Sequence, residues 1–297
     1  MLAWSLDAAI ATNASRIISV LPRQSEQIQE WLDGREFCIQ DKPLGTGHAV
    51  LAAAPNLADF DGIALIMFAD TPLVTADTLT RLASSIDATT SVAVLGFETS
   101  DPHGYGRLVI ENSGELTRIV EDKDADKDEQ RITLVNSGIM AVRCPLLFDL
   151  LHLVQPNSKN GEIYLTDIIQ LANQNGHKVT YRISDEAEIA GVNDRADLAH
   201  LEAVLQRRLR HAAMQQGATL IAPDTVFLSA DTIVGRDVII EPHVVIGPNT
   251  KIGEGSIIKS FSHIEGAKLG ACCVIGPHAR LRPGTEAGDG VKIGNFV

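Results

Sequence analysis

The sequence is poor in aromatic residues and contains no long apolar segment. Aromatic side chains make up 4% of its 297 residues. The longest uninterrupted apolar stretch covers only residues 63–69, whereas a membrane-spanning helix needs about 20 apolar residues. The first residues also lack the basic segment that opens a secretory signal. These absences exclude a membrane protein and predict a cytoplasmic location.

Cysteine is scarce, and its spacing is uninformative for metal binding. The chain has 4 cysteines, and no two of them form a Cys-x-x-Cys pair. Neither a zinc site nor a disulfide scaffold is therefore indicated. We expect all of them to be small buried side chains in a reducing compartment. They are Cys38, Cys144, Cys272 and Cys273.

Basic residues are outnumbered, with 25 lysines and arginines against 38 aspartates and glutamates and a net charge of −13. Proteins that bind nucleic acid present basic patches to the phosphates, so this balance excludes a general nucleic-acid surface. The densest basic group, Arg207, Arg208 and Arg210, falls on a predicted helix. We interpret it as the solvated face of that helix.

What the chain does contain is typical of a soluble α/β protein with two domains. Helical and strand patterns alternate through residues 1–183, which favours a doubly wound sheet, although residues 101–142 read as an antiparallel insertion. We place one domain at residues 1–194, a connecting helix at 195–217 and a second domain at 218–297.

The apolar stretch at residues 63–69 predicts a strand buried on both faces of a parallel sheet. It leads into Asp70, and Pro72 then forces a turn. Ligands of open α/β sheets collect beyond the carboxyl ends of the strands, so Asp70 is a candidate for handling a metal or a phosphate. A carboxylate that merely caps a turn is an equally good reading at this point.

The second domain has a different pattern, in which aliphatic residues recur every six positions with one single-residue slip. Glycine directly follows many of them, which allows sharp corners. This period predicts a parallel β-helix whose aliphatic side chains point inward, and an assembly scaffold is one open reading of it. The aliphatic positions are Leu228, Val234, Ile240, Ile246, Ile252, Ile258 and Ile264, and after the slip Leu269, Ile275, Leu281 and Ile293.

Several polar residues follow predicted strands or glycine turns at one edge of the first domain. Singly they are ambiguous: Asn193 could be a helix N-cap, and Gln40 a solvated strand end. Together they describe a pocket with a metal carboxylate, amides for a base and polar groups for sugar hydroxyls. No nucleophile–base pair is recognisable, which favours direct phosphoryl-type transfer. The set comprises Gln40, Gly45, Thr46, Gly47, Asp70, Tyr105, Glu121, Asn136 and Asn193.

Over nearly its whole length the chain resembles the bacterial bifunctional N-acetylglucosamine-1-phosphate uridyltransferase and glucosamine-1-phosphate acetyltransferase family. The matching motifs occur in order along the chain. They are Gln40 with Leu-Gly-Thr-Gly-His-Ala at 44–49, Phe-Ala-Asp-Thr-Pro-Leu at 68–73, Gly-Tyr-Gly-Arg at 104–107, Ile-Val-Glu at 119–121, Asn-Ser-Gly at 136–138, Tyr-Leu-Thr-Asp at 164–167, Gly-Val-Asn-Asp-Arg at 191–195 and Ala-Arg-Leu-Arg-Pro-Gly at 279–284.

This resemblance implies a nucleotidyltransferase domain, a left-handed β-helix acetyltransferase domain, and synthesis of UDP-N-acetylglucosamine for cell-wall and lipopolysaccharide precursors. It implies Mg²⁺ and acetyl-CoA, with UTP and sugar phosphates as substrates and a homotrimer formed through the β-helix. The metal ligands and catalytic residues it implies are Asp70 and Asn193. The substrate-binding residues it implies are Gln40, Gly45, Thr46, Gly106, Glu121, Asn136, Thr166 and, on the β-helix, Arg282.

The chain departs from the family at both ends, where the family's phosphate-binding loop and the second half of its β-helix have no counterpart. We therefore expect a truncated chain with little or no activity of its own. At residues 68 and 69, Phe-Ala replaces the family's Tyr-Gly, which removes one hydroxyl from the sugar site. The alternatives are a related sugar-phosphate nucleotidyltransferase of other specificity and a non-catalytic trimerising scaffold.

Overall fold

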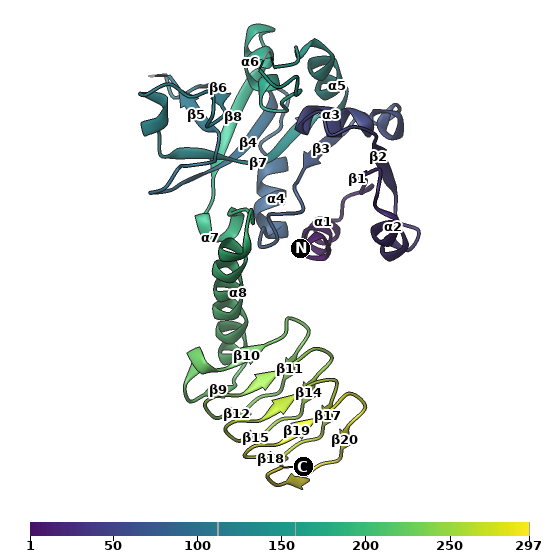
Figure 1. The fold of residues 1–297 in the computed structure, drawn as a ribbon, viewed down its shortest axis with the longest axis vertical. Coiled ribbons are helices and arrows are strands. Elements are labelled where there is room, and N and C mark those ends of the chain that lie inside the picture. Colours follow the sequence, from purple (N-terminus) through teal and green to yellow (C-terminus); the bar gives the residue numbers. More distant parts are fainter. Residues whose placement is uncertain (112, 158, 297) are drawn as a thin grey trace. The chain divides into compact units, whose positions relative to one another are not determined.

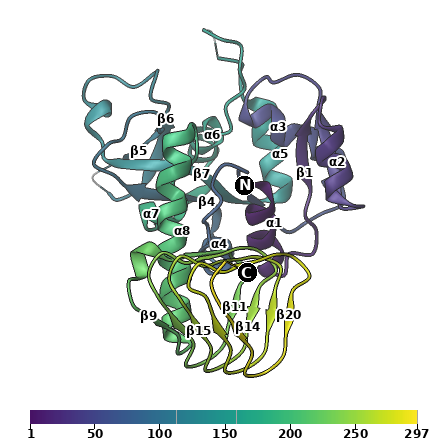
Figure 2. The same ribbon diagram turned by 60° about the horizontal axis from the view of Figure 1, so that its bottom comes forward.

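The computed structural model describes residues 1–111, 113–157 and 159–296. It consists of two compact units, Met1–Asp194 and Arg195–Val297 (Figures 1 and 2). Each unit has its own hydrophobic core. In the part of the chain that the structure describes, no helix has the length and apolar character needed to cross a membrane.

The first unit is built on a mixed sheet with the strand order β6-β5-β7-β4-β8, in which β3 also pairs with β7. Strands β4 and β8 are parallel, and the other pairs are antiparallel. The strands are β3 (Ile63–Ile66), β4 (Thr90–Glu98), β5 (Arg107–Ile110), β6 (Leu116–Val120), β7 (Leu134–Arg143) and β8 (Lys178–Ile183).

Helices cover both faces of this sheet. Successive residues of β4 and β7 point to opposite faces, and both faces are apolar. Val94 packs in the core cluster that includes Leu147 and Ile168, whereas Leu95 packs in the cluster that includes Leu79. The helices are α3 (Thr46–Ala52), η1 (Ala54–Leu57), α4 (Ala76–Ala83), η2 (Glu129–Arg131), α5 (Cys144–Leu153), α6 (Asp167–Gln174) and α7 (Glu186–Ile189). The predicted doubly wound α/β architecture is therefore confirmed.

The first forty residues form a small layer of their own. Here β1 (Ser19–Pro22) and β2 (Phe37–Gln40) make a two-stranded parallel sheet, accompanied by α1 (Leu2–Ala11) and α2 (Glu26–Leu32). Its core contains Leu6, Leu21 and Leu32.

The interpretation of residues 63–69 as a parallel strand buried on both faces is wrong. Strand β3 ends at Ile66, pairs antiparallel with β7, and is only partly buried, with Ile63 38% exposed. An apolar run indicates burial but not the direction of the neighbouring strand. The segment from residue 67 is a loop, and this loop carries Asp70.

The second unit combines one long helix with a left-handed parallel β-helix of two-residue strands. Strand partners lie 18 residues apart, as in Ile239 and Ile257, and 17 apart where the slip falls, as in Lys251 and Lys268. The inward residues form one continuous core, which confirms the six-residue period. The elements are α8 (Arg195–Gln215), β9 (Thr219–Leu220), η3 (Pro223–Thr225), β10 (Phe227–Leu228), β11 (Ile233–Val234), β12 (Ile239–Ile240), β13 (Val245–Ile246), β14 (Lys251–Ile252), β15 (Ile257–Ile258), β16 (His263–Ile264), β17 (Lys268–Leu269), β18 (Val274–Ile275), β19 (Arg280–Leu281), β20 (Glu286–Ala287) and β21 (Lys292–Ile293).

Two expectations about polar and sulfur-containing side chains need correction. Arg210 does not lie on a solvated helix face: it is 7% exposed, and it donates to the Val226 carbonyl and pairs with Asp224 at 3.0 Å. Cys272 is exposed rather than buried, because it occupies a corner of the β-helix with φ +56°. Cys38 is half-buried, and all four thiols are free.

Candidate active site

The two residues expected to hold a metal lie on segments that meet. Asp70 follows β3, and its carbonyl accepts a 2.9 Å hydrogen bond from the Val192 amide, which precedes Asn193. The Asp70 side chain is half-buried. This burial raises the pKa of its carboxyl, and a hydrogen bond from its own backbone offsets the effect only in part. A nearby cation would stabilise the ionised form.

Phe68 joins the Asp70 loop to the strand that carries Asn136. A Cβ on Gly138 would lie 2.7 Å from Phe68 Cε2, so the ring packs directly on this glycine, whose φ is +85°. Asn136 is 9% exposed, and its Oδ1 accepts a 3.0 Å hydrogen bond from the Gly138 amide. Only glycine combines this close approach with this backbone conformation. The Phe68 ring and the Asn136 side chain consequently both contact the same glycine.

Three further predicted residues connect to Asn136 one after another, beginning with Gly106. The Gly106 carbonyl accepts a 2.7 Å hydrogen bond from the backbone N–H of Asn136. Glu121 Oε2 lies 3.6 Å from the position that a Cβ on Gly106 would take. On the other side of Glu121, Oε1 accepts a 2.8 Å hydrogen bond from Thr166 Oγ1. Residues just before β5, on β7, just after β6 and at the start of α6 thus form one polar group.

The predicted base-binding residues connect to this group through Thr166. Gln40 Nε2 donates to the Gly45 carbonyl at 3.1 Å. Thr46 Oγ1 accepts a 3.0 Å hydrogen bond from the Leu165 amide, directly before Thr166. Gly45 has φ +100°, and a Cβ there would lie 2.6 Å from the carbonyl oxygen of Ile163. The glycine turn is therefore docked against the segment that presents Thr166.

Arg282 belongs to the second unit. It lies directly after β19, its side chain is exposed, and its carbonyl accepts hydrogen bonds from the amide and the hydroxyl of Thr285. The local turn therefore holds the Arg282 backbone and leaves the guanidinium at the surface of the β-helix.

Two residues at the site were not singled out from the sequence. His48 Nδ1 lies 3.1 Å from Gln40 Nε2, within hydrogen-bonding distance of the side chain that also donates to the Gly45 carbonyl. Asp167 begins α6, and its pKa is raised by burial and then by the carboxylates of Glu121 and Asp124. The signal for both was their place in the matching motifs, directly beside a chosen residue.

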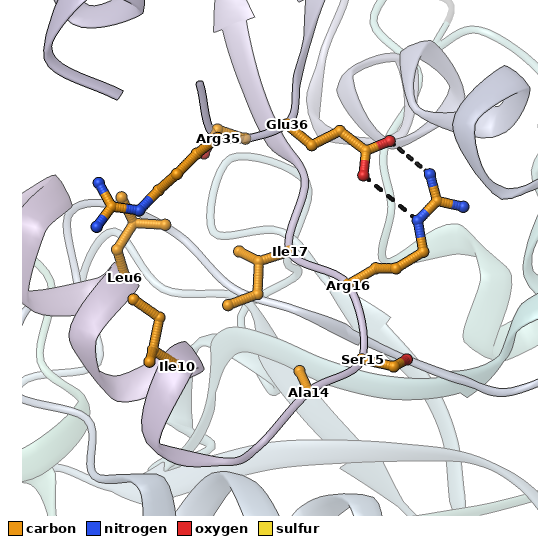
Figure 3. Close-up of a pocket in the computed structure, with 9 residues that line it drawn as sticks. Leu6, Ile10, Ala14, Ser15, Arg16, Ile17, Arg35 and Glu36 are labelled. Atoms are coloured by element: carbon orange, nitrogen blue, oxygen red, sulfur yellow. Dashed lines mark hydrogen bonds and ion pairs between the residues drawn. The ribbon is translucent and has the colours of Figure 1, made fainter. Parts of the chain in front are cut away.

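A cavity of about 340 Å³ lies elsewhere in the first unit, between α1 and the start of β1 (Figure 3). The apolar side chains of Leu6, Ile10 and Ile17 line it. Arg16 and Glu36 form an ion pair at its edge, with Nη2 and Oε1 2.5 Å apart. None of the predicted site residues lines this cavity, so it is not part of the candidate active site.

The donor set at Asp70 fits magnesium better than a transition metal. Among the described residues, no group of three or more His, Cys, Asp or Glu side chains could hold a metal ion. Mg²⁺ prefers oxygen ligands and usually binds through one or two carboxylates, substrate phosphates and water. One half-buried carboxylate, on a loop that is hydrogen-bonded to the segment of Asn193, matches that preference.

Two family models match the chain. Residues 1–133 match a MobA-like NTP transferase domain. Residues 231–266 match the bacterial transferase hexapeptide of six repeats. The matched residues fall in the sheet of the first unit and in the β-helix of the second.

Similar proteins include three that are called bifunctional protein GlmU. The protein of Maricaulis maris is 48% identical over 80% of this chain and 53% of its own length. That of Cereibacter sphaeroides is 47% identical over 100% of this chain and 66% of its length. That of Zymomonas mobilis is 43% identical over 100% of this chain and 67% of its length. The chain thus spans about half to two thirds of the curated relatives that it matches.

Among solved structures, UDP-glucose pyrophosphorylase in complex with UDP-glucose is similar, with a TM-score of 0.51 and 17% identity over 60% of this chain and 76% of that chain. At this identity the likeness concerns the fold alone. The sequence relationship is far stronger, since the Zymomonas mobilis protein is 43% identical across the full chain and two thirds of its own length. The chain therefore belongs to the family of bifunctional GlmU proteins.

Proposed function

We propose that the site in the first unit transfers a uridylyl group from UTP to N-acetylglucosamine 1-phosphate, giving UDP-N-acetylglucosamine and pyrophosphate. The observation that carries this proposal is the run of contacts from Gln40 through Thr46 and Thr166 to Glu121. It joins residues suited to a base with a residue suited to a sugar. Membership of the GlmU family and the NTP transferase match support it.

In this proposal the chain acts by positioning. Glu121 accepts hydrogen bonds from the sugar, and the Asn136 amide both accepts and donates them. The Gly106 backbone borders the sugar. The phosphate oxygen of the sugar phosphate then attacks the α-phosphorus of UTP, and pyrophosphate leaves. Asp70 and Asn193 would hold Mg²⁺, which neutralises charge on the phosphates.

A binding experiment on the 297-residue chain tests this assignment. We expect UDP-N-acetylglucosamine, titrated calorimetrically with Mg²⁺, to bind about tenfold more tightly than UDP-glucose, because the site hydrogen-bonds the substituent that distinguishes them. Glu121→Gln should abolish this preference. Glu115→Gln is the matched control, because Glu115 is an exposed carboxylate on the same hairpin.

The outcomes separate the alternatives. Tighter binding of another nucleotide sugar would favour a related nucleotidyltransferase of other specificity. Absence of any nucleotide-sugar binding would favour a scaffold role and overturn the proposal. Pyrophosphate release from UTP and N-acetylglucosamine 1-phosphate tests the separate expectation that this chain has little or no activity of its own, and measurable release would overturn that expectation.

For the second unit we propose acetyl transfer from acetyl-CoA to glucosamine 1-phosphate within a homotrimer formed by the β-helix. The exposed guanidinium of Arg282 supports this, because arginine binds phosphate in a bidentate manner. Arg282→Lys should weaken binding of glucosamine 1-phosphate and leave UDP-N-acetylglucosamine binding unchanged. A monomer in analytical ultracentrifugation would contradict the trimer.

A further inference from the structure

The largest side chain that is fully buried in the described part of the first unit is a charged one, Arg107 at the start of β5, which is 2% exposed. Its Nη2 pairs with Asp122 Oδ1 at 2.8 Å, and its Nη1 donates to the Tyr105 carbonyl. Its Nε is buried without a hydrogen-bond partner among the described residues. Burying a guanidinium with an unsatisfied nitrogen costs free energy.

Asp122 is the centre of the arrangement. While Oδ1 binds Arg107, Oδ2 accepts a 3.0 Å hydrogen bond from the Gly104 amide and lies 3.2 Å from His103 Nδ1. Burial opposes the ionised form of Asp122. The Gly104 amide and the charges of Arg107 and His103 outweigh it, so the pKa of Asp122 lies below its ordinary value. The carboxylate is therefore an ion in the folded state at neutral pH.

The two partners are each next to a residue of the proposed sugar site. Arg107 follows Gly106, and Asp122 follows Glu121. Arg107 also pairs with Val120 in the register of the β5–β6 hairpin. The ion pair therefore closes the hairpin at the end where Gly106 and Glu121 approach each other, with Glu121 Oε2 3.6 Å from a Cβ position on Gly106.

A contribution to stability alone does not explain an ion pair at this position. Buried ion pairs often contribute no more than well-packed apolar residues of the same volume, since their attraction is offset by the loss of hydration. What this pair does supply is directional geometry, because the planar guanidinium directs Nη2 to Asp122 and Nη1 to the Tyr105 carbonyl at the same time.

We propose that the Arg107–Asp122 ion pair is a positioning device that sets the spacing between Gly106 and Glu121, and thereby the affinity for the sugar half of a nucleotide sugar. The pair touches no ligand itself. This inference rests on the proposed uridyltransferase function.

The test compares UDP-N-acetylglucosamine with UDP, which lacks the sugar. In Asp122→Asn we expect the affinity for UDP-N-acetylglucosamine to fall about tenfold, because small displacements of positioned groups weaken binding strongly. The affinity for UDP should stay within about twofold. A purely structural role of the pair would lower both affinities together.

A matched control is the ion pair between Arg118 on β6 and Glu129 in η2, whose Nη2 and Oε1 are 2.7 Å apart. Neither of these residues adjoins a proposed sugar-binding residue. Glu129→Gln should leave both affinities unchanged within about twofold. Equal losses in Asp122→Asn and Glu129→Gln would overturn the inference.

Arg107→Lys is the second variant, in case Asp122→Asn does not fold as judged by circular dichroism. Lysine keeps the charge and loses the planar fork, so the sugar-specific loss should persist. Unchanged preference for UDP-N-acetylglucosamine over UDP in the folded variants would refute the positioning role. If the unmodified chain itself shows no such preference, the proposed function fails, and the ion-pair inference fails with it.

Discussion

Thr166 Oγ1 donates a 2.8 Å hydrogen bond to Glu121 Oε1 across 45 residues of sequence. Thr166 is 6% exposed and Glu121 is half-buried, so this bond is shielded from solvent competition. It links the β5–β6 hairpin to the start of α6, and it is the point at which the proposed base-binding and sugar-binding residues meet.

Removing the hydroxyl of Thr166 should therefore loosen Glu121. For Thr166→Val we expect a loss of about 1–2 kcal/mol in the free energy of unfolding and several-fold weaker binding of UDP-N-acetylglucosamine. Thr117→Val is the control, since Thr117 Oγ1 donates to the Val109 carbonyl on the same hairpin at 3.0 Å. Chemical denaturation and calorimetry measure the two effects. A control that weakened ligand binding equally would contradict a specific role for Thr166.

Asp70 should destabilise the protein unless a cation is bound. Burial raises the pKa of Asp70 above its unfolded value, so this group favours folding only at low pH, and the contribution is lost as pH rises through the folded pKa. At neutral pH, Asp70→Asn should have a melting temperature equal to or above that of the unmodified chain without Mg²⁺. Added Mg²⁺ should raise the melting temperature of the unmodified chain alone. An equal rise in both proteins would argue against Asp70 as a ligand.

Glu188 should stabilise the first unit at neutral pH and lose this effect at acidic pH, which is the reverse of Asp70. Burial opposes its ionisation, but the hydroxyls of Thr75 and Thr78, the Thr75 amide and Ser184 together lower the pKa of Glu188. Its Oε1 accepts from Thr75 at 2.9 and 2.6 Å, at the start of α4. A lowered pKa gives stability that is present above the unfolded pKa and is lost as pH falls through the folded pKa.

We therefore expect Glu188→Gln to lose about 1 kcal/mol at pH 7, allowing for the partial exposure of the side chain, and to match the unmodified chain at strongly acidic pH. Urea denaturation across this pH range measures the difference. A stability difference that did not change with pH would contradict the assignment.

Gln206 should be a main anchor of α8 on the β-helix. Its side chain is 6% exposed, donates to the Leu228 carbonyl at 2.8 Å and accepts from the Leu228 amide at 2.9 Å, as a neighbouring strand would. Gln206→Leu leaves two buried backbone groups unsatisfied, which should cost about 2–4 kcal/mol of unfolding free energy. Gln215→Leu, at an exposed position of the same helix, should change it by less than about 0.5 kcal/mol. Comparable losses of unfolding free energy in both variants would contradict a specific contribution from the two hydrogen bonds of Gln206.

Gly45 should be irreplaceable for steric reasons. With φ +100° and a Cβ position 2.6 Å from the Ile163 carbonyl oxygen, Gly45→Ala must displace the turn from the segment that leads to Thr166. We expect at least about tenfold weaker UDP binding. Gly34→Ala is the matched control, because Gly34 also has positive φ, +79°, but open space around it. It should lower stability by about 1 kcal/mol and leave UDP affinity intact.

The sequence was informative wherever a pattern is local. Pro145 in the first turn of α5 and Gly176 just after α6 lie at helix ends that local chemistry specifies. The seven-residue apolar run was less informative, because it indicates burial without naming the partner strand. The antiparallel pairing of β3 with β7 depends on residues about 80 positions away.

The same distinction applies to the site. The resemblance to the family was what grouped Glu121, Asn136 and Thr166, and it gave no sign that Arg107 and Asp122 form an ion pair. A charged residue in a sequence is normally expected to be solvent-exposed, and only the packed hairpin shows that Arg107 is buried. The interpretation of Arg210 as part of a solvated helix face was wrong in the same way, because its burial depends on contacts with Val226 and Asp224 that the sequence does not show.

The sequence by itself therefore determined the alternation of helix and strand, the six-residue period with its single slip, and the order of the polar motifs, because each depends on near neighbours in the chain. Only the tertiary structure decided which strands pair, which arginines are buried, and that Gln40 connects to Glu121 through Thr46 and Thr166. Those contacts join residues tens of positions apart, and their energies exist only once the chain has packed.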